Sequence, residues 1–478
     1  MTESRVGAEA GPPSSSSPSP ASPSPASPSP APPSTGSPSA GSSTSGSLSS
    51  SRRAVDELPG AGEHVEFVEH LLARIEAVDP DLHAFVAEPD RAGRLRDEVS
   101  SLARRWPVPD SRPGLYGVPV GVKDVFHADG LPTHGGSQLP AEVLTGPQAS
   151  AVTRLREAGA VVAGKTVTAE FAFMAPGPTR NPHRLGHTPG GSSSGSAAAV
   201  AAGLVPLALG TQTVGSVVRP AAYCGIVGFK PSYGRIPADG LIANAPTFDT
   251  VGVLTPDVAG AVRAAAVLLD DWDVRTHAEQ AGGRPVLGVP EGPYLGQATP
   301  EALAAFAAQV ARLEAAGYAV RRVRLLADID AVNERNTLIN LVELARSHEP
   351  LFAKYADSYN EVSATAIRQG ERIPTADYAR ALDERATYAS DLVGVMETEH
   401  IDAWIAPSAT GPAPEGLATT GSPLMNLPWT QARLPVVGVP AGLVAGLPVG
   451  LQCVARPGED ERLLAWAGAI EATLGERQ

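Results

Sequence analysis

Three things are scarce in this 478-residue sequence: cysteine, positive charge and long apolar runs. The two cysteines, Cys224 and Cys453, lie far apart and cannot build a disulfide framework, so we expect a reducing compartment. With 37 basic against 51 acidic residues, the net charge of −14 argues against a surface that binds nucleic-acid phosphates. No apolar run approaches the roughly 18 to 20 residues of a membrane-spanning helix, and no Sec signal follows Met1. We therefore expect a cytoplasmic protein with a large core.

The first 52 residues differ in composition from the rest of the chain. Residues 12–51 carry no charge and, apart from alanine, contain a single aliphatic side chain, Leu48. Such a segment cannot bury enough apolar surface to offset the entropy that ordering would cost. We therefore predict a disordered, Ser/Pro-rich tail over residues 1–52. A docking or phosphorylation arm and a dispensable tail both fit this composition, and the second needs no further signal.

Helix and strand signals alternate from about Arg52 onward, which predicts an α/β fold. We expect one large domain over residues 53–478, because no Ser/Pro-rich linker divides them. We divide it into a core over 112–260, a variable, largely helical region over 275–400, and a return to the sheet over 400–478. The apolar spacing predicts helices over 64–75, 97–106, 152–158, 258–269, 301–315 and 460–474, and strands over 117–126, 160–163, 403–407 and 435–440.

Two short motifs match known signatures but stand in the wrong context. Residues 159–166 fit the P-loop, yet a helix precedes them and their apolar, β-branched residues are typical of a strand. Residues 191–195 fit the nucleophile elbow around Ser193, but a loop stands where the elbow needs a strand. His64 and His70 are six residues apart, which does not suit metal ligands on one helix face. Nucleotide binding is therefore a weak alternative. We also predict no metal site.

Lysine is unusually rare, because the 37 basic residues include only Lys123, Lys165, Lys230 and Lys354. Arginine keeps its proton at neutral pH, whereas a buried lysine can lose it and act as a base. Lys123 ends an apolar strand, where desolvation would lower its pKa. The local sequence equally allows a buried ion pair of Lys123 with Asp124 or Asp249.

Two loops rich in glycine and serine favour the catalytic interpretation. The first runs Pro189-Gly-Gly-Ser-Ser-Ser-Gly-Ser196, and the second runs Gly210-Thr-Gln-Thr-Val-Gly-Ser-Val-Val-Arg-Pro220. Glycines let the backbone approach a reacting carbonyl and donate N–H groups to its oxyanion, while serines offer hydroxyl groups. Either loop alone would fit a flexible turn, so the argument depends on finding both.

Together with Lys123, these loops closely resemble the amidase signature family. The resemblance runs from Gly117 through Cys224-Gly-Ile-Val-Gly-Phe-Lys-Pro to Asp249-Thr-Val-Gly, and resumes weakly around Asn426 and Gln452. It covers most of residues 53–478. It implies the amidase signature fold, a mixed twisted β-sheet sandwiched between layers of α-helices.

The resemblance implies that Lys123, Ser192 and Ser216 are the catalytic residues. Ser216 would attack an amide carbonyl and form an acyl-enzyme, while Lys123 accepts the proton through Ser192. Ser192 would then pass the proton to the leaving amine, and its peptide bond would be cis. Such a reaction needs no histidine, metal or cofactor.

The second loop would also supply the oxyanion hole, from the N–H groups of Thr213, Val214, Gly215 and Ser216. Val214 departs from the family, which usually has glycine there, and a β-branched residue is unfavourable wherever φ is positive. Gln212 replaces the commoner aspartate of the family, as in a recognisable subset of it.

Three residues are candidates for supporting or substrate-binding roles: Ser193, Gln212 and Arg219. Ser193 would support its neighbours by hydrogen bonds, or would be the nucleophile under the elbow interpretation. Arg219 would either clamp a substrate carboxylate or form a structural ion pair with an acidic residue such as Asp249.

We predict an amidohydrolase that cleaves a small-molecule carboxamide to an acid and ammonia or an amine. One alternative is the glutaminase-type subunit of a tRNA-dependent amidotransferase, a group that looks different around Arg219. The other is a catalytically impaired, scaffold-like relative, which Val214 alone favours. We expect a small-molecule amide as the partner, no nucleic acid, no membrane and no cofactor, and a homodimer is the assembly that we consider.

Overall fold

A ten-stranded β-sheet organises the computed structural model, which describes residues 64–281 and 283–475. These residues belong to one unit, Ser50–Gln478, and the predicted tail over 1–52 lies outside them. The strands are β1 (Pro119–Lys123), β2 (Val161–Thr166), β3 (Leu207–Gln212), β4 (Val227–Lys230), β5 (Thr250–Thr255), β6 (Leu287–Glu291), β7 (Val320–Arg324), β8 (Ala403–Pro407), β9 (Val436–Val444) and β10 (Leu447–Val454).

The sheet is mixed, and its order is β2-β1-β3-β5-β4-β9-β10-β8-β6-β7. β1 runs parallel to β2 and β3, whereas β5 runs antiparallel to β3 and β4. β9 and β10 form an antiparallel pair, and β6 runs parallel to β7 and β8.

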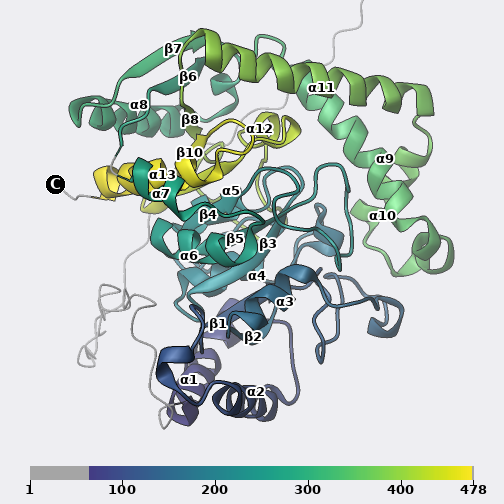
Figure 1. The fold of residues 1–478 in the computed structure, drawn as a ribbon. Coiled ribbons are helices and arrows are strands. Elements are labelled where there is room, and N and C mark those ends of the chain that lie inside the picture. The colour runs from purple at the N-terminus through teal and green to yellow at the C-terminus, as the bar shows by residue number, and fades with distance from the viewer. Residues whose placement is uncertain (1–63, 282, 476–478) are drawn as a thin grey trace, which may run out of the picture. The chain divides into compact units, whose positions relative to one another are not determined.

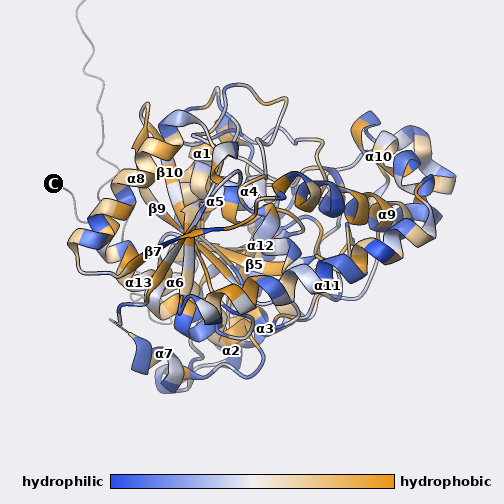
Figure 2. Ribbon diagram, turned by 90° about the horizontal axis from the view of Figure 1, so that it is seen from above, coloured by the Kyte–Doolittle hydropathy of each residue, from blue (hydrophilic) through white to orange (hydrophobic). Residues whose placement is uncertain are grey.

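Helices lie on both sides of this sheet (Figures 1 and 2). They are α1 (His64–Leu82), α2 (Arg91–Arg105), α3 (Ser150–Glu157), α4 (Ser194–Ala201), α5 (Val218–Cys224), α6 (Val258–Leu268), α7 (Val274–Gln280), α8 (Pro300–Ala315), α9 (Ile329–Tyr355), α10 (Glu361–Glu371), α11 (Thr375–Thr398), α12 (Leu427–Gln431) and α13 (Asp460–Gly475). The predicted α/β fold, with a mixed sheet between helical layers, is confirmed.

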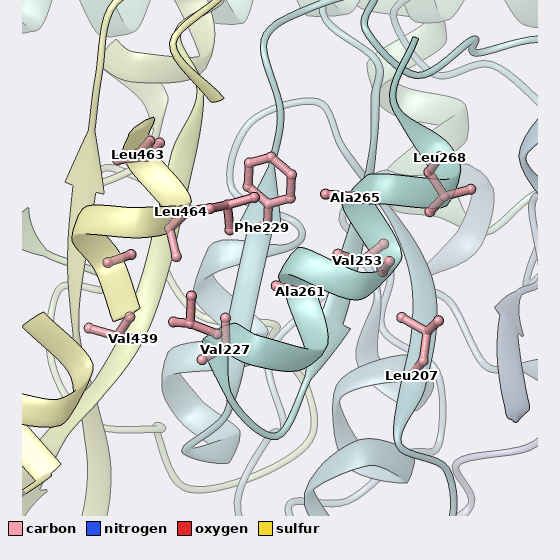
Figure 3. Close-up of a cluster of buried hydrophobic side chains, with 14 of the residues drawn as sticks. Leu207, Val227, Phe229, Val253, Ala261, Ala265, Leu268, Val439, Leu463 and Leu464 are labelled. Atoms are coloured by element: carbon pink, nitrogen blue, oxygen red, sulfur yellow. The ribbon is translucent and has the colours of Figure 1, made fainter. Parts of the chain in front are cut away.

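Alternation along the strands divides the core between the two faces. Leu207 and Leu209 of β3 join the cluster that includes α6, while Ala208 joins the cluster that includes α4. Figure 3 shows the first of these clusters, where Leu207 and strand residues such as Val253 lie near Ala261 and Ala265 of α6. Both faces are apolar, which explains why β1 and β3 lack the polar alternation of an exposed strand.

The structure departs from the predicted elements in two instructive places. The region over 275–400 contains β6 and β7 among its helices. β7 is an edge strand of sequence Val-Arg-Arg-Val-Arg, and most of its residues are exposed, so it lacks the apolar run that marks a buried strand. The helix predicted from residue 97 begins at Arg91, because the Asp90 side chain caps it by accepting from the Gly93 N–H.

Among the described helices, none is long and apolar enough to cross a membrane. The cytoplasmic location stays a prediction.

Candidate active site

The ends of neighbouring strands place the first site residues together. β1 ends at Lys123 and its parallel neighbour β3 ends at Gln212, so both segments leave the sheet at the same edge. β5 runs antiparallel to β3, and its first residue, Thr250, pairs with Gln212. Asp249 therefore lies at this edge too, where the loop over 213–217 begins.

Lys123 is completely buried among hydroxyl groups. Its Nζ donates to the Ser192 Oγ at 2.8 Å and to the Thr211 Oγ1 at 2.7 Å. Burial lowers the pKa of Lys123 to about 7, and the negative charge of Asp249 opposes that shift. A lysine in this state can give up its proton near neutral pH, and the amine can then accept one from Ser192.

The ion pair that we considered for Lys123 is not formed. The Asp124 carboxylate lies 2.8 Å from the Nζ of Lys165, a second buried lysine. The Asp249 carboxylate accepts instead from the Thr213 hydroxyl and from two backbone N–H groups. Within residues 64–281 and 283–475, no carboxylate forms an ion pair with Lys123.

The first loop brings Ser192 to this lysine. The Gly191–Ser192 peptide bond is cis, as the family resemblance implies. The Ser192 carbonyl accepts from the Ala169 N–H at 3.0 Å, and α4 begins two residues later. The structure thus joins Lys123 and Ser192 directly, and their catalytic roles stay a prediction.

The second loop holds Ser216 and a row of backbone donors. Ser216 is 6% exposed, whereas Lys123 and Ser192 are 0% exposed, so of these three residues Ser216 is the one that solvent reaches. Its hydroxyl makes no hydrogen bond with any described residue, so the structure does not join Ser216 to Ser192. The described residues likewise offer no acceptor to the backbone N–H groups over 213–216.

Val214 avoids the conformation that would make a β-branched residue unfavourable. It is not among the described residues with positive φ, and its half-buried side chain packs against the cluster that includes α12. The neighbouring Gly215 is the position that requires glycine, because a Cβ there would lie 2.5 Å from the Asn426 Oδ1. The departure from the family at Val214 therefore leaves the loop backbone free to adopt its conformation.

Side chains tie down both ends of this loop. The Gln212 Oε1 accepts from the N–H groups of Val217 at 2.9 Å and Val218 at 3.0 Å, where α5 begins. The Thr213 hydroxyl donates to the Asp249 Oδ1 at 2.6 Å. Gln212 is therefore a buried support of the loop and not a residue that faces solvent.

Ser193 lies against strand β3. Its Oγ donates to the Thr211 carbonyl at 3.3 Å and accepts from the Thr211 N–H at 3.4 Å, and the side chain is completely buried. No strand precedes it in the described loop, so the geometry does not support the elbow interpretation.

Arg219 is a buried support of the first loop. Its guanidinium donates to the Gly191 carbonyl at 2.7 Å, to the Gly421 carbonyl at 2.8 Å and to the Thr420 Oγ1 at 3.2 Å. Burial lowers the pKa of Arg219 to about 10. The ion pair with Asp249 that we considered is not formed, and the groups that Arg219 contacts belong to the protein itself.

The groups present at the site are Lys123 with its lowered pKa, the hydroxyl groups of Ser192 and Ser216, and the backbone N–H groups over 213–216. Within the described ranges, no group of three His, Cys, Asp or Glu side chains is arranged to hold a metal ion. The set that is present can relay a proton and can stabilise an oxyanion.

Comparison with known proteins identifies the family. The amidase family model matches residues 66–464. The chain belongs to the amidase signature family. Its fold is similar to that of a crystallised amidase, with 31% identity, a TM-score of 0.76, and coverage of 87% of this chain and 97% of that one. The native peptide amidase from Stenotrophomonas maltophilia has 28% identity and a TM-score of 0.73, over 87% of this chain and 95% of that one.

A curated relative of this amidase signature chain corrects one prediction. A glutamyl-tRNA(Gln) amidotransferase subunit from Roseiflexus sp. (strain RS-1) is 32% identical, over 89% of this chain and 95% of its own length. The sequence led us to expect a small-molecule amide as the partner and no nucleic acid, with a homodimer as the assembly considered. That prediction is wrong, because the relative is named as one subunit of an enzyme that is itself named for a tRNA.

Sequence reasoning missed several residues of the site. Thr211, whose hydroxyl accepts from the Lys123 Nζ, is the last residue but one of β3 and could have been found from its place in the Gly210–Pro220 motif. Asn426 and Thr430 contact the same loop from more than 200 residues away along the chain, and no local pattern points to that contact.

Proposed function

We propose that this chain cleaves a carboxamide through an acyl-enzyme on Ser216, as the glutaminase-type subunit of a tRNA-dependent amidotransferase. The observation that carries the chemistry is the 2.8 Å contact between the Lys123 Nζ and the Ser192 Oγ, with a lysine pKa of about 7. The role within an amidotransferase is supported by relatives of that name, which this chain matches over nearly their whole length.

In the proposed reaction, the Ser216 Oγ attacks the amide carbonyl while its proton moves to Ser192, and the Ser192 proton moves to Lys123. The N–H groups over 213–216, which have no acceptor among the described residues, would bind the oxyanion. The C–N bond then breaks as Ser192 returns a proton to the leaving nitrogen, which departs as ammonia. Water attacks the acyl-enzyme along the same relay and releases the acid.

The contact from Ser192 to Ser216 belongs to this proposal. Hydrogen bonds between catalytic groups are often long in the free enzyme and shorten when substrate binds. The buried position of Ser192 and the partial exposure of Ser216 suit a relay that becomes complete with a bound amide.

The scaffold-like alternative loses its support. Val214 is the feature that favours it, and this residue is not among the described residues with positive φ. The sequence around Arg219 counts against the glutaminase alternative, yet in the structure the two terminal nitrogens of that side chain donate to protein carbonyls.

The first test identifies the nucleophile by intact-mass spectrometry after treatment with a fluorophosphonate. We expect a single adduct on wild type, loss of the adduct in Ser216→Ala, slower labelling in Ser192→Ala and normal labelling in Ser193→Ala. An adduct that survives Ser216→Ala and is lost in Ser193→Ala would overturn the assignment of the nucleophile.

The second test asks what the labelled enzyme hydrolyses. Ammonia release from L-glutamine is measured with the chain alone, and again with glutamyl-tRNA(Gln) and the other amidotransferase subunits present. We expect release that rises in the complete mixture and disappears in Ser216→Ala. Labelling of Ser216 without ammonia from glutamine in either condition would refute the glutaminase assignment and leave the amidase centre standing.

A further inference from the structure

Thr430 of helix α12 contacts both the end of β3, at Gln212, and the candidate oxyanion loop over residues 213–217. Its Oγ1 accepts from the Gln212 Nε2 at 2.8 Å and lies 2.9 Å from the Val214 carbonyl. Gln212 is 0% exposed and Thr430 is 1% exposed, so water does not replace these bonds. These two hydrogen bonds therefore connect the end of β3 and the loop to a residue more than 200 positions away along the chain.

The chemistry of these groups fixes which one donates and which one accepts in each hydrogen bond. A carbonyl oxygen can only accept, so the Thr430 O–H must donate to the Val214 carbonyl. The Thr430 oxygen is then left to accept, so the Gln212 amide must present its NH2 group to it. The Oε1 of that amide consequently faces the N–H groups of Val217 and Val218, which are donors. An aspartate, the commoner family residue at 212, could not make the donation to Thr430.

The Val214 carbonyl and the Gly215 N–H belong to one planar, trans peptide unit, so they point in opposite directions. Holding the carbonyl on Thr430 thus aims the Gly215 N–H away from the Thr430 hydroxyl. That N–H finds no acceptor among the described residues. Thr430 thus sets the direction of the Gly215 N–H without contacting the oxyanion that this N–H would bind.

α12 itself is firmly anchored. Trp429, the residue before Thr430, is completely buried, and its Nε1 donates to the Tyr294 hydroxyl at 2.9 Å. Its ring stacks on Trp404 with centroids 6.4 Å apart and meets Tyr294 edge-on at 5.5 Å. A hydroxyl on this helix can therefore hold a loop carbonyl in one place.

We propose that Thr430 is a positioning residue, which acts through Gln212 and the Val214 carbonyl to aim the Gly215 N–H at the oxyanion. This inference rests on the proposed function, because it requires that the loop over 213–216 bind a developing negative charge.

The test compares Thr430→Val, which removes the hydroxyl at nearly constant volume, with Thr430→Ser, which keeps it. We expect the fluorophosphonate labelling rate of Ser216 to fall about 10- to 100-fold in Thr430→Val and to stay within about threefold of wild type in Thr430→Ser. Where an amide substrate is in hand, kcat should fall by a similar factor while KM stays unchanged, because the lost interaction strengthens only in the transition state.

Two controls separate positioning from general loosening. Thr398→Val makes the same chemical change on the exposed face of α11, where the hydroxyl bonds the Gly394 carbonyl, and should label at the wild-type rate. The pH midpoint of labelling, which depends on Lys123, should be the same in Thr430→Val as in wild type. If valine prevents folding, Thr430→Ala removes the hydroxyl without adding a methyl group and should give the same fall in rate.

The outcomes can be told apart. Labelling of Thr430→Val and Thr430→Ala at the wild-type rate would overturn the proposal for Thr430 and leave the proposed function intact. Thr430→Ser as slow as Thr430→Val would also overturn it, since the hydroxyl would then not be the cause. A wild-type chain that takes no label on Ser216 would refute the proposed function, and this inference with it.

Discussion

At the scale of single residues, burial gives Lys123 its distinctive property. An ordinary lysine, with a pKa of 10.5, is almost wholly protonated at neutral pH, whereas burial lowers the pKa of Lys123 to about 7. A general base works best when its pKa lies near the operating pH. The rarity of lysine makes Lys123 conspicuous in the sequence. Its completely buried position is the physical reason for its lowered pKa.

We expect the labelling rate of Ser216 to rise with pH through a midpoint near 7, because the neutral form of Lys123 is the base and forms as pH rises. Lys123→Met should remove this dependence together with most of the activity. The matched control is Lys230→Met, since burial lowers the pKa of Lys230 to about 7 as well, while its Nζ bonds the Pro231 carbonyl outside the site. Rates measured between about pH 5 and 9 check this, and a midpoint that moves in Lys230→Met would contradict it.

Asp249 provides a second test at the same scale. Its negative charge opposes the fall in the Lys123 pKa, so removing that charge should lower this pKa further. We therefore expect Asp249→Asn to shift the midpoint of the pH–rate curve to lower pH. The exposed Asp270, paired with Arg154, supplies the control Asp270→Asn, in which the midpoint should stay in place. A shift to higher pH in Asp249→Asn would show that the charge does not act on Lys123 in this way.

At the scale of elements, the candidate oxyanion loop is defined by what surrounds it. It joins β3 to α5 and lies against α12, whose N-cap residue, Asn426, approaches Gly215 closely. We expect Gly215→Ala to lower the labelling rate about 100-fold or more, because the new Cβ would lie 2.5 Å from the Asn426 Oδ1 and would displace the loop.

Gly394 offers the contrasting position for the same substitution. A Cβ there would meet no atom within 4 Å, and the residue lies inside helix α11, so Gly394→Ala should keep full activity. It should also stabilise the fold by about 0.5–1 kcal/mol, since alanine loses less backbone entropy in a helix. Labelling rates and thermal unfolding of both variants are the measurements. Equal labelling in Gly215→Ala and wild type would show that the loop tolerates displacement.

The elements also show how far the sequence alone could lead. Lys123, Ser192 and Ser216 could be named because each stands in a short motif, and the contact between the first two is formed. The strand β7 could not be recognised, because an arginine-rich edge strand buries too little to need an apolar pattern. The contact of Thr430 with the loop was equally hidden, since nothing within a local window shows which distant helix will pack there.

At the scale of the whole molecule, every residue placed in the site lies between Lys123 and Thr430, inside the described unit. The amidase family model matches residues 66–464, so residues 1–52 lie outside both the site and the family match. The described strand and helix pairs that hold the site together are formed among residues 64–281 and 283–475. Activity and stability should therefore be independent of the segment over 1–52.

We expect a chain that begins at Arg53 to label Ser216 at the wild-type rate and to unfold within about 2 °C of the full-length chain, because the described sheet and core clusters lie within residues 64–475. The full-length chain measured alongside is the control, and Ser216→Ala in both lengths fixes the background. If the shortened chain kept its thermal stability but lost ammonia release only when the other amidotransferase subunits are present, the segment would be a docking arm, as one interpretation of its composition allows. If labelling itself were lost, the catalytic unit would extend beyond the family match, and a boundary at residue 53 would be wrong.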